Sequence, residues 1–303
     1  MEYEEILMAK IAWYYYIEGK TQQSISDMLG ISRMRVIKLL DKAREQKIVQ
    51  FRIRPDNEQH VELENKIIEK YNLNDAYIVP SISENINESV ARAAAMYISE
   101  RAQRRSFINI GYGDTVSRTL KNLSFGSDSE ISLVSLTGGV SHYISIMDPS
   151  AKNASFYIIP APFLASSGEM ARAITEEASV SEILSMNKLA DMTIVGIGFL
   201  DENATVVKEG KLTSADLVVL EKSGAVGDVI GHFIDRNGNQ VEAPVHEKLI
   251  STSLESLKEF KNVVGVAGGY EKRCAINAAL KTNIINTLIT DEETARALLK
   301  IKD

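Results

Sequence analysis

The chain has 303 residues, which is long for one average domain and comfortable for two. Hydrophobic residues make up 45% and charged residues 25%, the balance of a globular protein that buries a core and not of a disordered or fibrous one. The single cysteine, Cys274, excludes an intrachain disulfide and fits a reducing compartment. The N-terminus lacks a signal-peptide pattern and no apolar run approaches about 18 residues, so we expect a soluble cytoplasmic protein without a membrane span.

Charge is divided unevenly along the chain, whose formal net charge is −7. Residues 1–54 hold ten Lys or Arg and seven Asp or Glu, a net of +3, and the remainder holds 24 basic and 34 acidic residues, a net of −10. An acidic average argues against nucleic acid, but a basic module on an acidic body is typical of a DNA-binding unit attached to a small-molecule domain. The motif in the basic part decides between these interpretations.

The basic part is predicted to contain three short helices. Apolar residues over 6–16 recur at helical spacing, and Gly19 stands where a helix C-terminal cap belongs. Thr21 is the expected N-cap of a second helix, Gly30 breaks the chain after it, and Ser32 caps a third. The second and third helices, joined by a glycine turn, have the spacing of a helix-turn-helix. Its expected shared core is formed by Ile25, Leu29, Ile31, Val36, Leu39 and Leu40.

The start of the third helix is the expected DNA-reading surface, because in this motif that helix enters the major groove. Arginine there suits guanine, while lysine and the start of the preceding helix suit phosphates. The residues predicted to contact DNA are Thr21, Gln22, Ser32, Arg33, Met34, Arg35 and Lys38. A plain amphipathic helical hairpin with a solvated basic face is the alternative. Two caps, a glycine turn, the core spacing and a basic helix start together favour the helix-turn-helix.

Two segments connect this module to the rest of the chain. The sequence IVQFRIRP, residues 48–55, alternates like a strand, which predicts a small β-wing that completes a domain of residues 1–55. Residues 56–71 are charged and helical and form a predicted linker helix. Its apolar positions could join the linker to the body or pair it with another subunit, and the sequence leaves both open.

The remainder, residues 72–303, alternates short apolar runs with helical stretches, the pattern of a parallel, Rossmann-like α/β sheet. The expected strands lie at 76–80, 106–111, 131–136, 155–160, 192–198, 262–269 and 286–290. Several end in glycine-rich turns: IGYGDT, LTGGVS, VGIG and VAGG. Glycine lets the backbone approach a ligand, and the following helix start offers N–H groups to an anion. Each turn alone could be a tight connection without a ligand, and neither a dinucleotide fingerprint nor a Walker A sequence occurs.

Polar residues near these turns suit a polyol phosphate. Asp228 lies in the small, apolar run SGAVGDVIG, where a carboxylate could accept hydroxyl hydrogen bonds from a sugar. Lys272 follows VAGGYE near a helix start, where an ammonium could hold a phosphate together with backbone amides. The alternative is that Asp228 caps a helix and that Lys272 is solvated.

Motifs over nearly the whole chain resemble, in the expected order, those of the SorC family of sugar-binding transcriptional regulators. They are TQQSISDMLGISRMRVIKLL, LTGGVS, IIPAPFLASS, VGIG, SGAVGDVIGHFIDRNG, GVAGGYEK and TDEETARALL. The stretches IAWYYYIEG and IIPAPFLASS are most similar to repressors that sense phosphorylated autoinducer-2. The resemblance implies a winged helix-turn-helix joined to a domain like the sugar-phosphate isomerases and deaminases. It also implies a homotetramer on operator DNA whose affinity falls when the effector binds.

The resemblance further implies an effector site, with the GG turn at the phosphate, Asp228 at the hydroxyls and Lys272 beside the effector. The implied effector-binding residues are Gly111, Gly113, Thr137, Gly138, Gly139, Val140, Ser141, Asp228 and Lys272. Some family members carry Lys before the Gly-Gly pair and bind an aldehyde as a Schiff base. This chain has Thr137 there, which predicts noncovalent binding.

We expect a regulator, most simply a repressor, that phosphorylated autoinducer-2 or a pentulose or polyol phosphate releases from DNA, with no cofactor and no metal. A sugar-phosphate isomerase or deaminase would need a positioned acid or base. The four histidines share no motif, and His142, just past the GG turn, is expected to line the pocket. The attached DNA-binding module favours a binding-only pocket. A third possibility, a large domain that only oligomerises, does not account for the clustered glycine turns.

Overall fold

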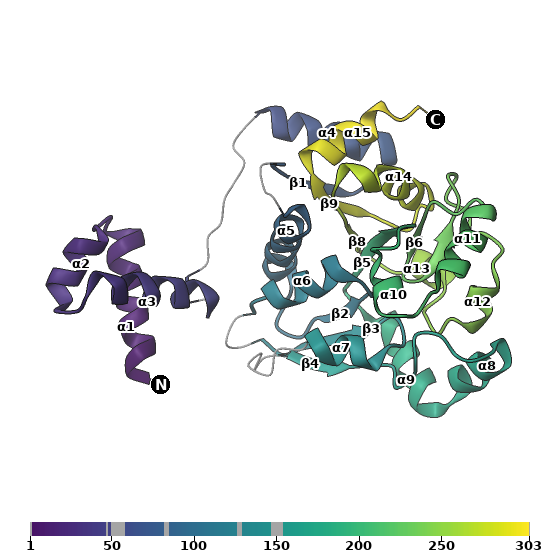
Figure 1. The fold of residues 1–303 in the computed structure, drawn as a ribbon, viewed down its shortest axis with the longest axis horizontal. Coiled ribbons are helices and arrows are strands. Elements are labelled where there is room, and N and C mark those ends of the chain that lie inside the picture. Colours follow the sequence, from purple (N-terminus) through teal and green to yellow (C-terminus); the bar gives the residue numbers. More distant parts are fainter. Residues whose placement is uncertain are drawn as a thin grey trace. The chain divides into compact units, whose positions relative to one another are not determined.

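The chain divides into two units, residues 1–55 and 56–303, and each is described by itself (Figure 1). The structure, a computed structural model, describes residues 2–46, 48–49, 58–81, 85–125, 129–146 and 154–302. Within these ranges no helix is both long enough and apolar enough to cross a membrane.

The first unit consists of short helices with the predicted caps. They are α1 (Glu2–Ala12), which continues into a π-helical turn (Trp13–Ile17), α2 (Gln22–Leu29) and α3 (Arg33–Glu45). Thr21 Oγ1 accepts the Ser24 N–H at the start of α2, and Ser32 Oγ accepts the Arg35 N–H at the start of α3. Gly30 ends α2 in the left-handed region, at φ 63°, which a residue without a side chain adopts at low cost.

The core of the first unit confirms the predicted helix-turn-helix. Ile25, Val36, Leu39 and Leu40 are buried, and Leu29 and Ile31 pack against them partly exposed. Helix α1 adds Met8, Ile11 and Ala12 to the same core. The predicted wing lies, apart from residues 48–49, outside the described residues.

The second unit is built on a parallel sheet, as predicted. Its seven parallel strands run in the order β1-β9-β8-β5-β2-β3-β4. They are β1 (Asp75–Val79), β2 (Phe107–Ile110), β3 (Ile131–Ser135), β4 (Ala154–Tyr157), β5 (Met192–Phe199), β8 (Val263–Val266) and β9 (Thr287–Asp291). Each overlaps a strand expected from the apolar runs, because strands buried on both faces need near-continuous apolar residues. Between β2 and β5 the strand order reverses direction, which makes this point a topological switch.

Two further strands were not predicted. The short strands β6 (Gly227–Val229) and β7 (His232–Ile234) form an antiparallel hairpin, and β6 also pairs with the end of β5. The two-residue turn between them has Ile230 at φ 47° and Gly231 at φ 86°. Asp228 therefore lies on a strand, and the alternative in which it caps a helix is wrong.

Helices cover both faces of the sheet (Figure 1). They are α4 (Glu58–Tyr71), α5 (Ile86–Arg101), α6 (Asp114–Asn122), α7 (Val140–Ile146), α8 (Gly168–Glu176), α9 (Ala178–Met186), α10 (Thr205–Lys208), α11 (Ser214–Lys222), α12 (Pro244–Lys248), α13 (Leu254–Lys258), α14 (Arg273–Lys281) and α15 (Glu292–Lys300), with 3₁₀ turns at Asn187–Leu189 and Tyr270–Lys272. Neighbouring strand residues serve opposite faces: Ile194 packs with α5 and α6, and Val195 with α4 and α14.

The predicted linker helix is α4, and its apolar side is part of the second unit. Leu63 and Ile67 are buried in the core that α14 and α15 also line. Glu64 Oε1 accepts the N–H of Ile78 at 2.9 Å, which satisfies a backbone donor of the edge strand β1. Of the two roles that the sequence left open, the structure thus shows the helix joined to the body.

Candidate functional site

The start of α3 presents the side chains predicted to contact DNA. Ser32, Arg33 and Arg35 are exposed there, and Met34 and Lys38 are exposed beside them. Arg33 Nη2 donates to Gln22 Oε1 at 3.4 Å, which links the starts of α3 and α2. The arrangement gives two arginines and one lysine free to approach an anionic surface from one helix end.

In the second unit a cavity of about 610 Å³ opens at the carboxyl ends of β2, β5 and β8. This is the topological switch point, where open α/β sheets bind ligands. Its walls include Asn87, Gly113, Asp114, Ser117, Arg118, His142, Gly198, Phe199, Thr205, Lys208, Glu209, Asp228, Glu271 and Lys272. Three of the predicted effector residues, Gly113, Asp228 and Lys272, thus lie in one cavity although they are far apart in the sequence.

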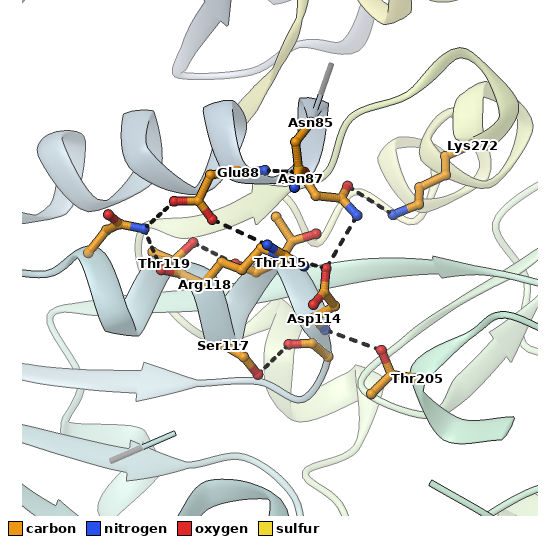
Figure 2. Close-up of polar contacts among 12 residues, drawn as sticks. Asn85, Asn87, Glu88, Asp114, Thr115, Ser117, Arg118, Thr119, Thr205 and Lys272 are labelled. Atoms are coloured by element: carbon orange, nitrogen blue, oxygen red, sulfur yellow. Dashed lines mark hydrogen bonds and ion pairs between the residues drawn. The ribbon is translucent and has the colours of Figure 1, made fainter. Parts of the chain in front are cut away.

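A polar network crosses one wall of the cavity (Figure 2). Lys272 Nζ donates to Asn87 Oδ1 at 3.5 Å, and Asn87 Nδ2 donates to Asp114 Oδ2 at 3.3 Å. Arg118 Nε donates to the same Asp114 oxygen at 2.8 Å, and its Nη1 donates to Glu88 Oε2 at 3.3 Å. The start of α6 is thereby tied to α5 and to the turn that carries Lys272.

Lys272 is available to a ligand. Burial lowers the pKa of its ammonium, and the carboxylates of Glu271, Asp114 and Asp228 oppose that shift. Among the described residues the only hydrogen bond of its ammonium is the long one to Asn87, and Nζ lies 5.8 Å from the centroid of the Phe199 ring. Lys272 is only partly exposed, and a phosphate or hydroxyl would find there a cation with one long hydrogen bond.

Asp228, in contrast to Lys272, is a hydrogen-bond acceptor, and the hairpin holds it in place. Desolvation raises the pKa of its carboxyl to about 6, although the Gly231 N–H and the positive charge of Lys272 counteract it. Its Oδ2 accepts the Gly231 N–H at 2.9 Å, and its Oδ1 lies so close to Gly198 that a Cβ there would clash with it. The close approach requires glycine at 198, which gives the VGIG motif a physical role.

The N-terminus of α6 faces the cavity. Gly113 precedes the helix at φ 123°, and its N-cap position makes no side-chain capping hydrogen bond. The Asp114 N–H donates to Thr205 Oγ1 at 3.3 Å, a contact visible in Figure 2. The dipole of a helix favours anions at its N-terminus, and Lys208 also lies on the cavity wall.

The predicted phosphate turn does not line this cavity. Thr137 is fully buried, and its Oγ1 lies 2.8 Å from the hydroxyl of Tyr143. Gly138 packs against Pro162, Gly139 against the ring of Tyr112, and neither Val140 nor Ser141 belongs to the walls. Gly111 is likewise enclosed, by Ile194 and Ile230. Of these residues, Gly139 lies against Tyr112, whose ring belongs to the cavity wall.

Sequence reasoning missed several cavity residues. Asn87, Ser117 and Glu209 carried no motif, and Tyr112 was part of the IGYG turn without being singled out. His142 was expected in the pocket and lies there, with its ring stacked on Tyr112 at a centroid distance of 3.9 Å. Its neighbours come from α6 and from the segment after β5, which no local pattern connects to it.

Comparison with known proteins matches both units. The sugar-binding domain family, Sugar-bind, matches residues 56–300, and the sigma-70 region 4 family matches residues 11–48. The transcriptional regulator LsrR of Klebsiella pneumoniae is 34% identical over 303 residues, covering 98% of this chain and 94% of the relative. LsrR of Escherichia coli K12 is 36% identical over 302 residues, covering 98% of this chain and 95% of the relative.

Solved structures agree with this assignment. The full-length sorbitol operon regulator SorC from Klebsiella pneumoniae superposes with a TM-score of 0.71 at 28% identity, covering 98% of this chain and 99% of that one. A DeoR family transcriptional regulator from Listeria monocytogenes gives 0.73 at 26% identity over 79% of this chain and 99% of that one. Together with the helix-turn-helix and the switch-point cavity, these matches show that the chain belongs to the SorC family of transcriptional regulators, in which a helix-turn-helix unit is joined to a sugar-binding domain.

Proposed function

We propose that this protein represses transcription by binding operator DNA through α3 and that a phosphorylated, sugar-like effector in the switch-point cavity releases it. Phosphorylated autoinducer-2 is the first compound to test, followed by pentulose and polyol phosphates. The protein acts as a homotetramer, so that several copies of α3 contact one operator. The DNA contacts are those at the starts of α2 and α3, from Thr21 to Lys38.

The observation that carries the proposal is that Asp228 and Lys272 line the same cavity. A carboxylate accepts hydrogen bonds from hydroxyls, and a cation beside a helix start holds phosphate oxygens. A molecule that has both hydroxyls and a phosphate satisfies both ends at once. The cavity volume of about 610 Å³ is within the range of small-molecule sites.

The placement of Thr137 supports noncovalent binding. The position carries no amine, and its side chain is buried with hydrogen-bond partners of its own. Release from DNA then requires only that the effector bind more tightly to the DNA-incompetent arrangement of the protein than to the competent one. A coupling free energy of about 1–3 kcal/mol is typical of such regulators.

The experiment is a fluorescence-anisotropy titration of the full-length protein against DNA from upstream of its own gene, at fixed salt because phosphate contacts are salt-dependent. Phosphorylated and free sugars are then added. We expect tight binding that one phosphorylated compound reverses and that its unphosphorylated form does not. DNA binding that no phosphorylated compound changes would refute the sensor part of the proposal.

Substitution of Arg35 tests the DNA-binding surface. Arg35→Ala removes an exposed guanidinium from the first turn of α3, while its backbone N–H still caps on Ser32. We expect operator affinity to fall by about tenfold or more, since a base contact is worth roughly 1–3 kcal/mol, with effector affinity unchanged. Lys121→Ala, on an exposed end of α6 in the other unit, is the matched control. Equal losses in both variants would contradict the assignment.

A further inference from the structure

One segment of the second unit closes the cavity from outside the sheet. Residues 201–212 follow β5 and contain α10, and they contribute Thr205, Lys208 and Glu209 to the wall. Val206 and Leu212 anchor the segment in a small apolar cluster that also holds Tyr112. The polar side of the segment is thus held facing the cavity.

Glu209 makes the principal polar contacts of this segment with the wall. Its Oε1 lies 2.7 Å from His142 Nδ1, and its Oε2 accepts a hydrogen bond from the hydroxyl of Tyr112. The other ring nitrogen of His142, Nε2, lies 3.2 Å from Ser117 Oγ. Two stacked rings therefore direct a phenol O–H and an imidazole nitrogen at one carboxylate.

The two partners differ in how firmly they are held. The His142 side chain is 4% exposed and packs against Tyr112, whereas the Glu209 side chain is 32% exposed. Burial and the Glu209 carboxylate raise the pKa of Tyr112, so its hydroxyl keeps its proton and remains a donor. The donors thus belong to buried rings of the wall, and the acceptor is a side chain that is partly exposed to water.

Two converging donors that hold two carboxylate oxygens have the geometry that also holds two oxygens of a phosphate. We propose that Tyr112 and His142 form an anion subsite for a phosphate monoester, and that the Glu209 carboxylate occupies it as an internal competitor which the ligand displaces. The choice of a phosphate as the ligand rests on the proposed function. Glu209 thereby raises the phosphate concentration at which the subsite becomes occupied.

Substitution of Glu209 should strengthen phosphate binding, the opposite of what is usual for a residue in a binding site. Glu209→Gln keeps the size of the side chain but replaces a charged acceptor by a weaker neutral one, so displacement costs less. We expect inorganic phosphate to bind the variant about tenfold more tightly than the wild type. A residue that itself held the ligand would give weaker binding when changed.

A matched control separates competition from general electrostatics. Glu271 lines the same cavity beside Lys272, and among the described residues it makes no hydrogen bond to Tyr112 or His142. Glu271→Gln removes the same charge and should tighten phosphate binding about twofold at most. Adding Tyr112→Phe to Glu209→Gln removes one donor of the subsite and should abolish most of the gain.

The experiment is isothermal titration of the full-length wild type and the three variants with inorganic phosphate, with the imidazole ¹⁵N signals of His142 followed by NMR. We expect the tenfold gain in Glu209→Gln and a shift of the His142 Nδ1 signal when phosphate saturates the wild type. Three results would overturn the inference. The phosphate affinity of Glu209→Gln could rise no more than that of Glu271→Gln, or the His142 signal of the wild type could stay unmoved. The third is that neither the wild type nor Glu209→Gln binds phosphate. The titration contains no DNA, so a failure of operator release by sugar phosphates would refute the proposed function alone.

Discussion

The ionised carboxyl of Asp228 suits a ligand with hydroxyl groups but lowers the stability of the folded protein. Its carboxyl has a pKa raised to about 6 by desolvation, with one strong hydrogen bond from the Gly231 N–H. In the unfolded chain it would ionise near its ordinary value of 3.8. The carboxylate is therefore less stable in the folded protein than in water, so stability is lost as pH rises from about 4 to about 6.

Replacing Asp228 should separate stability from sensing. Asp228→Asn removes the buried charge and keeps an acceptor for the Gly231 N–H. We expect the free energy of unfolding to rise by about 1–3 kcal/mol at pH 7, since one pKa unit corresponds to about 1.4 kcal/mol, and the difference to vanish near pH 4. Urea denaturation at both pH values measures it, and anisotropy should show DNA binding that the effector no longer reverses. A variant less stable than the wild type at pH 7 would contradict the argument.

Sequence reasoning located part of the cavity at the level of single residues. Gly113, Asp228 and Lys272 were identified, since each follows or interrupts an apolar run at a strand end. The turn around Gly138 has the same local pattern but faces Pro162. Whether such a turn lines the cavity depends on residues elsewhere in the sequence, such as Pro162 at Gly138. That information is absent from any local pattern.

At the scale of elements, the parallel strands were predictable and the β6–β7 hairpin was not. The parallel strands are continuous apolar runs, whereas β6 and β7 have three residues each. The sequence of a two-residue hairpin turn normally contains Asn-Gly or Asp-Gly. Here Ile230, a β-branched residue, adopts φ 47°, a conformation that it disfavours. The strain is sustained by burial of Ile230 and lies beside Asp228, at the cavity.

The same hairpin gives this unit an acid-sensitive element. His246 Nε2 accepts the N–H of Phe233 in β7 at 3.0 Å, and burial and the neighbouring His232 lower the pKa of His246 to about 4. Because the folded pKa lies below the ordinary 6.5, the folded protein resists protonation there. The stability that depends on neutral His246 is present above pH 6.5 and lost as pH falls towards 4.

A glutamine at 246 tests this directly. His246→Gln retains an acceptor within reach of the Phe233 N–H but does not titrate. Between pH 7 and pH 4.5 the wild type should lose about 1–2 kcal/mol more stability than the variant, a figure reduced for the partial exposure of the ring. Urea denaturation across this range provides the measurement. Parallel pH profiles for the two proteins would rule out His246 as the cause.

At the scale of the whole molecule, hydrogen bonds join the ligand cavity to the linker helix. The Gly269 N–H, in the turn that carries Lys272, donates to Asp291 Oδ1 at 2.8 Å. Asp291 is also the N-cap of α15, through the Thr294 N–H. At the other end of α15, Lys70 of α4 donates to the carbonyls of Leu298 and Ile301. Residues 1–55 precede α4 in the chain, so the hydrogen bonds of α15 link the turn that carries Lys272 to the helix that follows the DNA-binding unit.

Removing the hydrogen bonds between Lys70 and α15 should reduce the effect of the effector on DNA affinity more than it reduces the affinity for DNA or for the effector. Lys70→Met keeps the apolar stem and removes the donor from the last carbonyls of α15. Measured separately, operator affinity and effector affinity should each stay close to wild type, while the effector-induced loss of DNA affinity becomes about fivefold smaller. Lys66→Met, one turn earlier and exposed, is the control. Undiminished release in Lys70→Met would exclude this route.

The pairing of β1 with β9 also fixes an order of events during synthesis. The core of the first unit is drawn from residues 7–49, so it can form once that stretch has left the ribosome. Strand β1 must wait for β9, where Asp75 lies beside Thr287, and α4 must wait for the end of α15. A growing or prematurely ended chain thus completes its DNA-binding unit long before its ligand cavity. Under the proposed function, such fragments would carry the DNA-contacting helix α3 but neither the cavity that senses the effector nor the unit that completes the tetramer.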